Sequence, residues 1–349
     1  MKKILLILVG GTICTALNEK GTLSVSETAG ALIKENFLNS DSVFAKDVQI
    51  DLSENLFILS ENMTVDKWNI MIKAYRDCMS KGDYDGVIFA HGTDTLAYSA
   101  SLFSVILSGT DIPVFFVSSQ QRLDLPTANG NANFRCAVEC ICKGIAPNVY
   151  VPYRNVCDGK MYLHLASRLK QCANYSDDFF SEGAVDMGAD DCFEQVQNMY
   201  PPESRKAVGQ FTDDFLLKDG VLMLAPYVGL DYSVIDYGRF SAVLHGTYHS
   251  GTACVENTQD NACYGKNSIL YMLDECGRKG VDVYISPSRS TGEIYDTVRI
   301  IANHNQPSFL YGMTNEMAYA KLLVAYSLFD DKQKIDEFLS TEFNFEFLQ

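Results

Sequence analysis

Short apolar runs alternate with helical patterns along the first half of the chain. The runs are rich in β-branched and aromatic residues, are flanked by Gly, Pro or Asp as strands are, and cover 4–9, 86–90, 113–117 and 148–153. Between the first two runs, apolar residues from Trp68 to Met79 mark one face of a helix, with Thr64 as its N-cap. Strands that alternate with helices predict a β-α-β series built on a mainly parallel sheet.

The same alternation returns in the second half, with a helix expected around 268–276 and strands expected at 221–227, 241–246 and 281–286. Between the halves, residues 186–214 show little apolar periodicity, which indicates a linker. We therefore expect an α/β protein with a larger N-terminal domain at 1–190, whose mainly parallel sheet has helices on both faces. A linker at 191–215 and a smaller C-terminal α/β domain at 216–349 complete the prediction.

Composition narrows the class of protein. A chain of 349 residues that is 47% hydrophobic can bury a substantial core. The net charge of −16 argues against a nucleic-acid partner, because phosphate binding needs clustered Lys and Arg. No run approaches the roughly 18 apolar residues of a membrane span. The start of the chain resembles a signal peptide, but its apolar run covers only 4–9 and leads into no cleavage site, so it is interpreted as the first strand.

The eleven cysteines do not form a disulfide pattern, because their number is odd and their spacings follow no framework. We expect reduced thiols and hence a cytoplasmic protein. Cys136, Cys140 and Cys142 lie within a helical pattern and lack both a Cys-x-x-Cys pair and a nearby His. They are interpreted as small buried hydrophobic residues rather than as metal ligands.

Polar residues follow the first three strands directly. The first strand leads into Gly10-Gly11-Thr12, the second into the segment 91–95 (HGTDT) and the third into the segment 118–122 (SSQQR). Ligands of an open parallel sheet bind beyond the carboxyl ends of the strands, so these clusters are expected to meet at one edge.

The residue types in these clusters suit amide chemistry. Thr12 after two glycines suits a nucleophile, because glycine allows close backbone approach and leaves N–H groups free for an oxyanion. Asp94 can bind a substrate ammonium, and Thr93 can position a water or act as a second nucleophile. The alternative is that Gly10-Gly11 is only a flexible turn and that Thr93 or Asp94 caps the next helix. Capping and catalysis are compatible.

These motifs resemble the two signatures of the bacterial-type L-asparaginase family. The signatures are Gly10-Gly11-Thr12-Ile13 and the segment 91–95, and the likeness continues through the segments 59–68, 118–134 and 312–327. The resemblance implies a two-domain α/β enzyme, usually a homotetramer without a cofactor, that hydrolyses the side-chain amide of asparagine to aspartate and ammonia. Active sites in that family lie at subunit contacts, so at least a dimer is expected.

The resemblance also assigns roles to residues. The position of Thr12 is that of the nucleophile, and Thr93 and Asp94 match a second catalytic cluster. Ser60 and Glu61 match the pair that holds the carboxylate and ammonium ends of the substrate. As further substrate-binding residues we place Gly11, Gly92 and Ser119.

Two positions depart from the family pattern. The segment 14–26 (CTALNEKGTLSVS) resembles the family's mobile lid, but Thr22 stands where the lid carries a Tyr. His164 stands five residues after Gly159, where the family has a Lys. A neutral imidazole accepts a proton near pH 7, so His164 is a candidate base, and a nearby Asp94 would raise its pKa. A shifted register would instead bring Lys160 or Lys170 to the site.

Other functions stay open beside asparagine hydrolysis. The altered positions allow a different substrate, such as glutamine or a modified or peptide-linked asparagine. The archaeal subunit that releases ammonia for tRNA amidation shares the fold and is placed lower, because it carries an extra N-terminal domain before the first strand. An amino-acid-binding relative without catalysis is disfavoured, since Thr12, Thr93 and Asp94 are all present.

Overall fold

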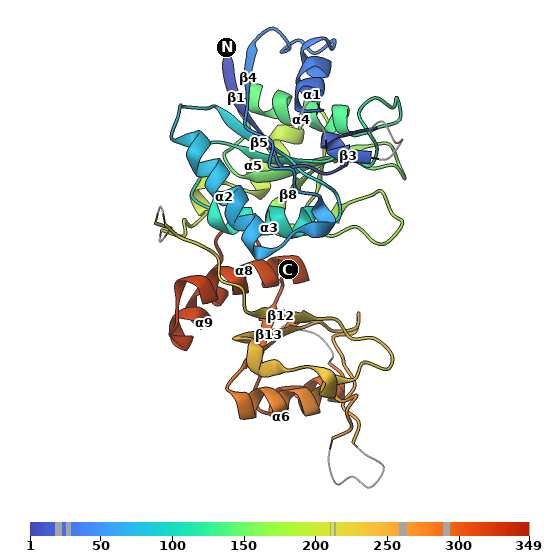
Figure 1. The fold of residues 1–349 in the computed structure, drawn as a ribbon, viewed down its shortest axis with the longest axis vertical. Coiled ribbons are helices and arrows are strands. Elements are labelled where there is room, and N and C mark those ends of the chain that lie inside the picture. Colours follow the sequence, from blue (N-terminus) through green and yellow to red (C-terminus); the bar gives the residue numbers. More distant parts are fainter. Residues whose placement is uncertain are drawn as a thin grey trace. The chain divides into compact units, whose positions relative to one another are not determined.

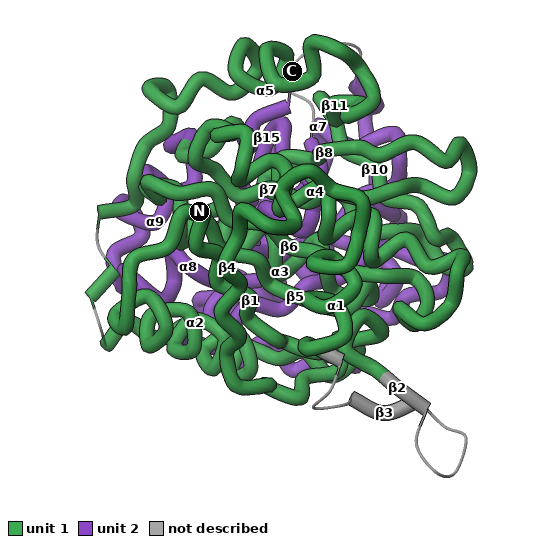
Figure 2. Tube along the Cα trace, turned by 90° about the horizontal axis from the view of Figure 1, so that it is seen from above, with its two compact units in different colours: residues 1–217, 343–345 green, residues 218–342, 346–349 purple. Residues whose placement is uncertain are grey.

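The computed structural model describes residues 1–17, 23–25, 29–209, 211–212, 214–257, 264–288 and 294–348. They divide into two compact units, coloured separately in Figure 2. Unit 1 comprises residues 1–217 and 343–345, and unit 2 comprises residues 218–342 and 346–349. The chain therefore returns to unit 1 for three residues close to its C-terminal end.

Unit 1 is built on a seven-stranded sheet with the strand order β11-β8-β7-β6-β5-β1-β4. Strands β4, β1, β5, β6 and β7 run parallel, whereas β8 and β11 join antiparallel at one edge. The strands are β1 Lys2–Leu8, β4 Val48–Leu52, β5 Gly86–Ala90, β6 Val114–Val117, β7 Val149–Arg154, β8 Met161–Leu165 and β11 Val185–Asp186. The central strands are buried on both faces, which explains their continuous apolar sequences.

Helices cover both faces of this sheet, as Figure 1 shows. The helices are α1 Ala29–Leu38, α2 Val65–Met79, α3 Leu96–Ile106, α4 Gly130–Cys142 and α5 Cys192–Met199. Helices α1 and α4 pack on one face, where Phe37 and Phe134 meet edge to face at 6.0 Å. On the other face, Phe89 of β5 stacks on Phe116 of β6 at 4.7 Å and contacts Phe103 of α3. The predicted α/β class with a mainly parallel sheet is confirmed.

Two antiparallel ribbons accompany the main sheet. Strand β2 (Thr15–Leu17) pairs with β3 (Leu23–Val25), and β9 (Leu169–Lys170) pairs with β10 (Phe180–Ser181). Short 3-10 turns include Thr12–Cys14 and Ser60–Asn62, each directly after a strand or an extended segment.

The segment expected to be a linker has structure of its own. Residues 191–215 contain helix α5 and the 3-10 turn Pro202–Ser204. The Arg205 guanidinium donates hydrogen bonds to the carbonyl oxygens of Ser108 and Thr110, at 3.2 and 3.1 Å. These contacts hold the segment within unit 1, and the division between the units falls after Leu217.

Unit 2 carries a four-stranded parallel sheet with the order β12-β13-β14-β15. Its strands are β12 Val221–Leu224, β13 Ala242–His245, β14 Asp282–Ser288 and β15 Ser308–Tyr311, and its helices are α6 Ile269–Lys279, α7 Asp296–Asn303, α8 Asn315–Leu328 and α9 Lys332–Ser340. The α6 helix is capped by the Ser268 side chain and ends at Gly280 in the left-handed conformation.

The last residues of the chain are bound in both units. In unit 1, the Asn344 carbonyl oxygen accepts from the Ser167 hydroxyl at 2.6 Å, and the Asn344 amide donates to Asn148 Oδ1 at 2.7 Å. In unit 2, Lys321 of α8 and Glu346 form an ion pair of 2.8 Å, with both side chains fully buried. The Lys321 ammonium also donates to the carbonyl oxygens of Leu339 and Thr341.

The cysteines were expected to be reduced thiols, and no membrane span was expected. The ten cysteines in the described part of the chain are all free thiols. Cys140 is buried in the core under α4, and Cys136 and Cys142 pack against the same core. Across the described residues, every helix is too short or too polar to span a membrane.

Candidate functional site

Glycines bring three segments together at the carboxyl edge of the unit 1 sheet. Gly11, with φ of +76°, lies so close to Gly92 that a Cβ atom on Gly11 would stand 2.1 Å from the Gly92 Cα. A Cβ on Gly10 would stand 2.1 Å from the carbonyl oxygen of Ile58. Since real Cβ contacts are never this short, only glycine fits. The turn after β1 is thus in direct backbone contact with the turn after β5.

Ser60 joins this contact from the segment that follows β4. Its buried hydroxyl accepts a hydrogen bond from the Asp94 N–H at 3.3 Å and donates one to Asp94 Oδ2 at 3.2 Å. The Ser60 carbonyl oxygen accepts from the Thr95 hydroxyl at 3.0 Å. Gly92 has room for no side chain here, because its Cβ would stand 2.4 Å from Ser60 Oγ. Gly11, Gly92, Ser60 and Asp94 therefore form one contiguous cluster.

The two candidate nucleophiles directly follow the two glycines of this cluster. Thr12 opens the 3-10 turn after Gly11, and its carbonyl oxygen accepts from the Thr15 hydroxyl at 2.9 Å. Thr93 follows Gly92 and precedes helix α3. Both residues are half-buried, and Asp94 is exposed. Each nucleophile thus follows a glycine of the Gly11–Gly92 contact.

The other two predicted substrate-binding residues differ in exposure. Glu61 lies in the 3-10 turn Ser60–Asn62 and is exposed. Ser119 is fully buried, where its hydroxyl donates to the Gln121 carbonyl oxygen at 2.5 Å and accepts from the Gly130 N–H at 3.1 Å. The hydroxyl of Ser119 therefore fixes the turn before α4, a structural task that the sequence did not indicate.

His164 lies on β8 in the interior. Its Nδ1 is 2.8 Å from the Ser181 hydroxyl of β10, and its Nε2 has no hydrogen-bond partner among the described residues. Burial lowers the pKa of His164 to about 3. The expectation that Asp94 raises this pKa is wrong. The His164 side chain is fully buried and its desolvation lowers the pKa, whereas Asp94 is exposed.

The alternative lysines lie at the surface. Lys160 is exposed and forms an ion pair with Asp186 at 2.8 Å. Lys170, on β9, is exposed as well. His91 directly precedes Gly92 of the cluster; its Nδ1 is 2.7 Å from the Gly92 carbonyl oxygen, and burial lowers its pKa to about 4. At neutral pH, His91 and His164 are both uncharged.

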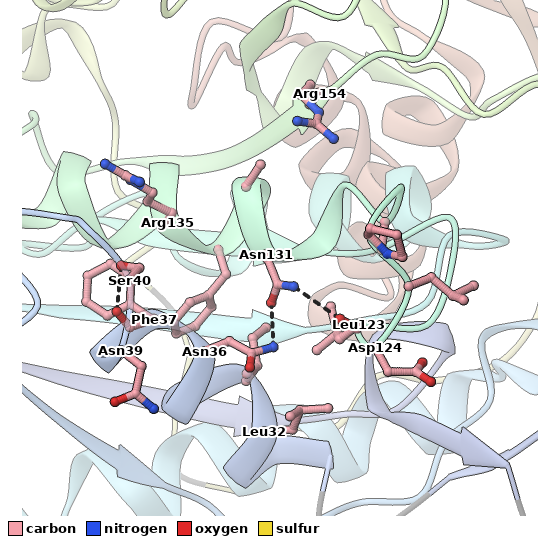
Figure 3. Close-up of a pocket in the computed structure, with 16 residues that line it drawn as sticks. Leu32, Asn36, Phe37, Asn39, Ser40, Leu123, Asp124, Asn131, Arg135 and Arg154 are labelled. Atoms are coloured by element: carbon pink, nitrogen blue, oxygen red, sulfur yellow. Dashed lines mark hydrogen bonds between the residues drawn. The ribbon is translucent and has the colours of Figure 1, made fainter.

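A cavity of about 660 Å³ lies elsewhere in unit 1, between α1, α4 and the loop 123–128 (Figure 3). Asn131 bridges it by donating to the Leu123 carbonyl oxygen and accepting from Asn36, at 3.2 and 3.1 Å. None of the predicted site residues lines this cavity. It is therefore distinct from the cluster at the sheet edge.

Residues 3–189 match the family model described as "Asparaginase, N-terminal", which is more than half of the chain. The chain belongs to the asparaginase family. The matched region contains every residue of the Gly11–Gly92–Ser60–Asp94 cluster, together with Thr12, Thr93 and His164.

Several curated relatives within this family share one name. The chain is 31% identical to a glutamyl-tRNA(Gln) amidotransferase subunit from Methanosarcina acetivorans over 200 residues, which are 54% of this chain and 46% of that protein. It is 25% identical to the protein of the same name from Methanopyrus kandleri over 349 residues, 95% of this chain and 72% of that one. The match to the first relative thus spans less than half of that protein's length.

Solved asparaginases have the same fold. The L-asparaginase of Thermococcus kodakarensis superposes with a TM-score of 0.71 at 21% identity, covering 99% of both chains. The L-asparaginase I of Vibrio cholerae gives a TM-score of 0.69 at 19% identity, covering 100% of this chain and 99% of the other. At these identities the likeness concerns the fold.

Sequence reasoning missed two residues beside the family site. Gln171 contacts the backbone of Thr93 and Ala97, and Ser181 contacts His164. Neither belongs to a motif. Gln171 directly follows β9 and Ser181 lies on β10, so the β9–β10 ribbon brings each of them to its partner. Thr22, the position of the family's lid Tyr, lies outside the described residues.

Proposed function

We propose that this chain is an amidohydrolase that converts L-asparagine to L-aspartate and ammonia, with Thr12 as the nucleophile. The observation that carries the proposal is the backbone contact of Gly11 with Gly92. This contact brings Thr12 and Thr93 to the same edge as the Ser60–Asp94 pair. A nucleophile and an ammonium-binding carboxylate at one sheet edge are what the reaction requires.

The proposed reaction has two halves. Thr12 Oγ attacks the amide carbon and loses its proton to a base, and the carbonyl oxygen becomes an oxyanion. The C–N bond then breaks, the nitrogen takes up a proton, and ammonia leaves. Water hydrolyses the resulting ester, which releases aspartate and restores the Thr12 hydroxyl. Ser60, Glu61 and Asp94 hold the two charged ends of the substrate, and Gly11 and Gly92 allow its close approach.

His164 is proposed as the group that moves the proton during the reaction. When Nδ1 donates to Ser181, Nε2 keeps a free lone pair. With a pKa of about 3, the His164 imidazole is neutral at pH 7, so the role proposed is to take up the proton that Thr12 loses only transiently and to pass it on to the leaving nitrogen. This role predicts that the titration of His164 does not lower the activity on the acid side of neutral pH.

The test is ammonia release from asparagine, glutamine and a peptide-linked asparagine. Thr12→Ala should abolish turnover while the fold persists, because the hydroxyl of a half-buried loop residue contributes little to the core. Thr110→Ala is the matched control, since Thr110 lies in the turn after α3, at the far end of that helix from Thr93. Activity retained in Thr12→Ala but lost in Thr93→Ala would move the nucleophile to Thr93.

A second candidate is the ammonia-releasing half of a tRNA amidation reaction, favoured by the name that the curated relatives share. Ammonia release that depends on added glutamyl-tRNA(Gln) would support it over free asparagine hydrolysis. No turnover of any amide, together with tight aspartate binding by calorimetry, would indicate a binding protein instead.

We also propose that the enzyme works without a cofactor, in the cytoplasm, as a dimer or tetramer. Free thiols throughout the described residues fit a reducing compartment. Light scattering at the assay concentration tests the assembly, and a fully active monomer would contradict it.

A further inference from the structure

Helix α3 begins at the Thr93–Asp94 turn without a local cap. Within the described part of the chain, the side chain of its N-cap residue Thr95 accepts no hydrogen bond from the helix. The Thr95 hydroxyl instead donates to the Ser60 carbonyl oxygen. Because the first N–H groups of a helix have no partner inside the helix, the Ala97 N–H must be satisfied from elsewhere.

Gln171 supplies that partner from another part of the sequence. Its Oε1 accepts from the Ala97 N–H at 3.2 Å, and its Nε2 donates to the Thr93 carbonyl oxygen at 2.8 Å. One side-chain amide thus binds the helix on one side of the turn and Thr93 on the other. A side-chain amide carries both a donor and an acceptor at neutral pH, and reversing it here would place like groups together.

Ser60, in the 3-10 turn Ser60–Asn62, also binds the Thr93–Asp94 turn. Its hydroxyl bonds to both the N–H and the carboxylate of Asp94. The residues from Thr93 to Thr95 are therefore fixed by Ser60 through Asp94 and by Gln171 through Thr93. Without Gln171, the one hydrogen bond that the described residues still give the Thr93 carbonyl oxygen is that from the Leu96 N–H, at 3.3 Å.

The ribbon that carries Gln171 also holds His164. Gln171 directly follows β9, and Leu169 of β9 pairs with Ser181 of β10. The Ser181 hydroxyl is the partner of His164 Nδ1. The β9–β10 ribbon therefore connects the proposed proton carrier with the Thr93–Asp94 turn.

We infer that Gln171 is a positioning residue that fixes the Thr93–Asp94 turn for the reaction, an inference that rests on the function proposed above. Gln171 acts through the Thr93 carbonyl oxygen, so its loss should misplace the Thr93 hydroxyl more than the Ser60–Asp94 pair. The effect should consequently appear in kcat rather than in KM.

Two variants of Gln171 test the inference. Gln171→Met removes the donor and the acceptor at similar size, and kcat should fall about 10- to 100-fold, as expected for a displacement near an ångström. Gln195→Met is the matched control, because the Gln195 side chain bonds to Asp191 on the exposed face of α5, away from the turn. It should leave kcat and KM unchanged.

Gln171→Glu adds a readout that a purely structural role would not move. The ionised carboxylate keeps an acceptor for the Ala97 N–H but faces the Thr93 carbonyl oxygen without a proton. Protonation restores a donor, so the ratio of variant to wild-type kcat should rise as the pH falls from about 7.5 towards the carboxyl pKa. A ratio that is independent of pH would contradict the proposed bond to Thr93.

Hydrogen exchange separates this inference from the proposed function. Mass spectrometry of peptides spanning Thr93 to Ser99 should show faster exchange in Gln171→Met than in the wild type and in Gln195→Met. If the wild type hydrolyses no amide, the proposed function fails. Faster exchange in Gln171→Met would still support the inference that Gln171 fixes the Thr93–Asp94 turn. Unchanged exchange, or wild-type kcat in Gln171→Met, overturns the positioning role.

Discussion

Gly11→Ala isolates the contact on which the proposed site depends. Gly11 has φ of +76°, and an added Cβ would stand 2.1 Å from the Gly92 Cα and 2.4 Å from the Gly92 nitrogen. Gly144, at the end of α4, has φ of +75° and nothing within 4 Å of the corresponding position. The two glycines share a positive φ, but Gly11 combines it with an extended ψ of −175°, and they differ in what an alanine would meet. Gly144→Ala is therefore a control for the cost of a positive φ without a steric contact.

The magnitude follows from these two contributions. A left-handed conformation costs an alanine about 1–2 kcal/mol, which applies at Gly144. At Gly11 the positive φ with an extended ψ of −175° belongs to a region that glycine alone adopts readily, and an alanine there costs about 1–3 kcal/mol. At Gly11, the turns after β1 and β5 must also separate by about an ångström, because backbone atoms cannot rotate away as a side chain can. Overpacking of this kind typically adds about 1–3 kcal/mol. Gly11→Ala should thus lower the free energy of unfolding by about 2–6 kcal/mol and Gly144→Ala by about 1–2 kcal/mol.

Urea denaturation of both variants, followed by circular dichroism, measures the difference. Gly11→Ala should also lose most amide hydrolysis, because the displaced turn carries Thr12, whereas Gly144→Ala should keep it. Equal destabilisation of the two variants would refute the reasoning, since it would mean that the turns separate at no cost. Full activity in Gly11→Ala would show that the Gly11–Gly92 approach is not required by the reaction.

The remaining predictions concern charge in the interior. His164 has a folded-state pKa of about 3 against about 6.5 unfolded, so the unfolded state binds more protons between these values and stability falls as the pH drops below about 6.5. In urea titrations between pH 4.5 and 6, His164→Gln should make the decrease of the free energy of unfolding with falling pH smaller by about 1.4 kcal/mol per pH unit. The same pH dependence in the variant and the wild type would contradict the burial of the His164 side chain. Glu346→Ala should cost about 3–5 kcal/mol, because it leaves the buried Lys321 ammonium without its carboxylate. Asp77→Ala, which breaks an exposed pair with Lys73, is its control and should cost less than about 1 kcal/mol in the same denaturation assay.

Local patterns predicted much of unit 1 because they reflect burial and capping. The run 86–90 forms β5 with the expected bounds, since a strand buried on both faces is apolar throughout. Helix α2 begins after Thr64, whose hydroxyl accepts from the Lys67 N–H as an N-cap should. The strand before Gly10-Gly11 ends at Leu8, and the polar residues after it lie beside those after β5.

Contacts between distant residues were not predictable in this way. Residues 191–215 lack a strong apolar period, yet they pack in unit 1 through groups such as Arg205. The register placed His164 on β8, but its depth, and hence the direction of its pKa shift, depends on the neighbouring ribbon. Gln171 bonds to residues 74 and 78 positions away, and nothing in its own sequence neighbourhood indicates that it does so.

The return of the chain to unit 1 has a consequence for biosynthesis. Ser167 and Asn148 form hydrogen bonds with Asn344, which is synthesised 177 residues after Ser167. At translation rates of about 5–20 residues per second, those buried polar groups wait roughly 10–35 s for their partner. During that interval, the strands and helices of unit 1 have been synthesised but its last residues, 343–345, have not. The polar groups of Ser167 and Asn148 are then the place where a chaperone that binds nascent chains would protect unit 1.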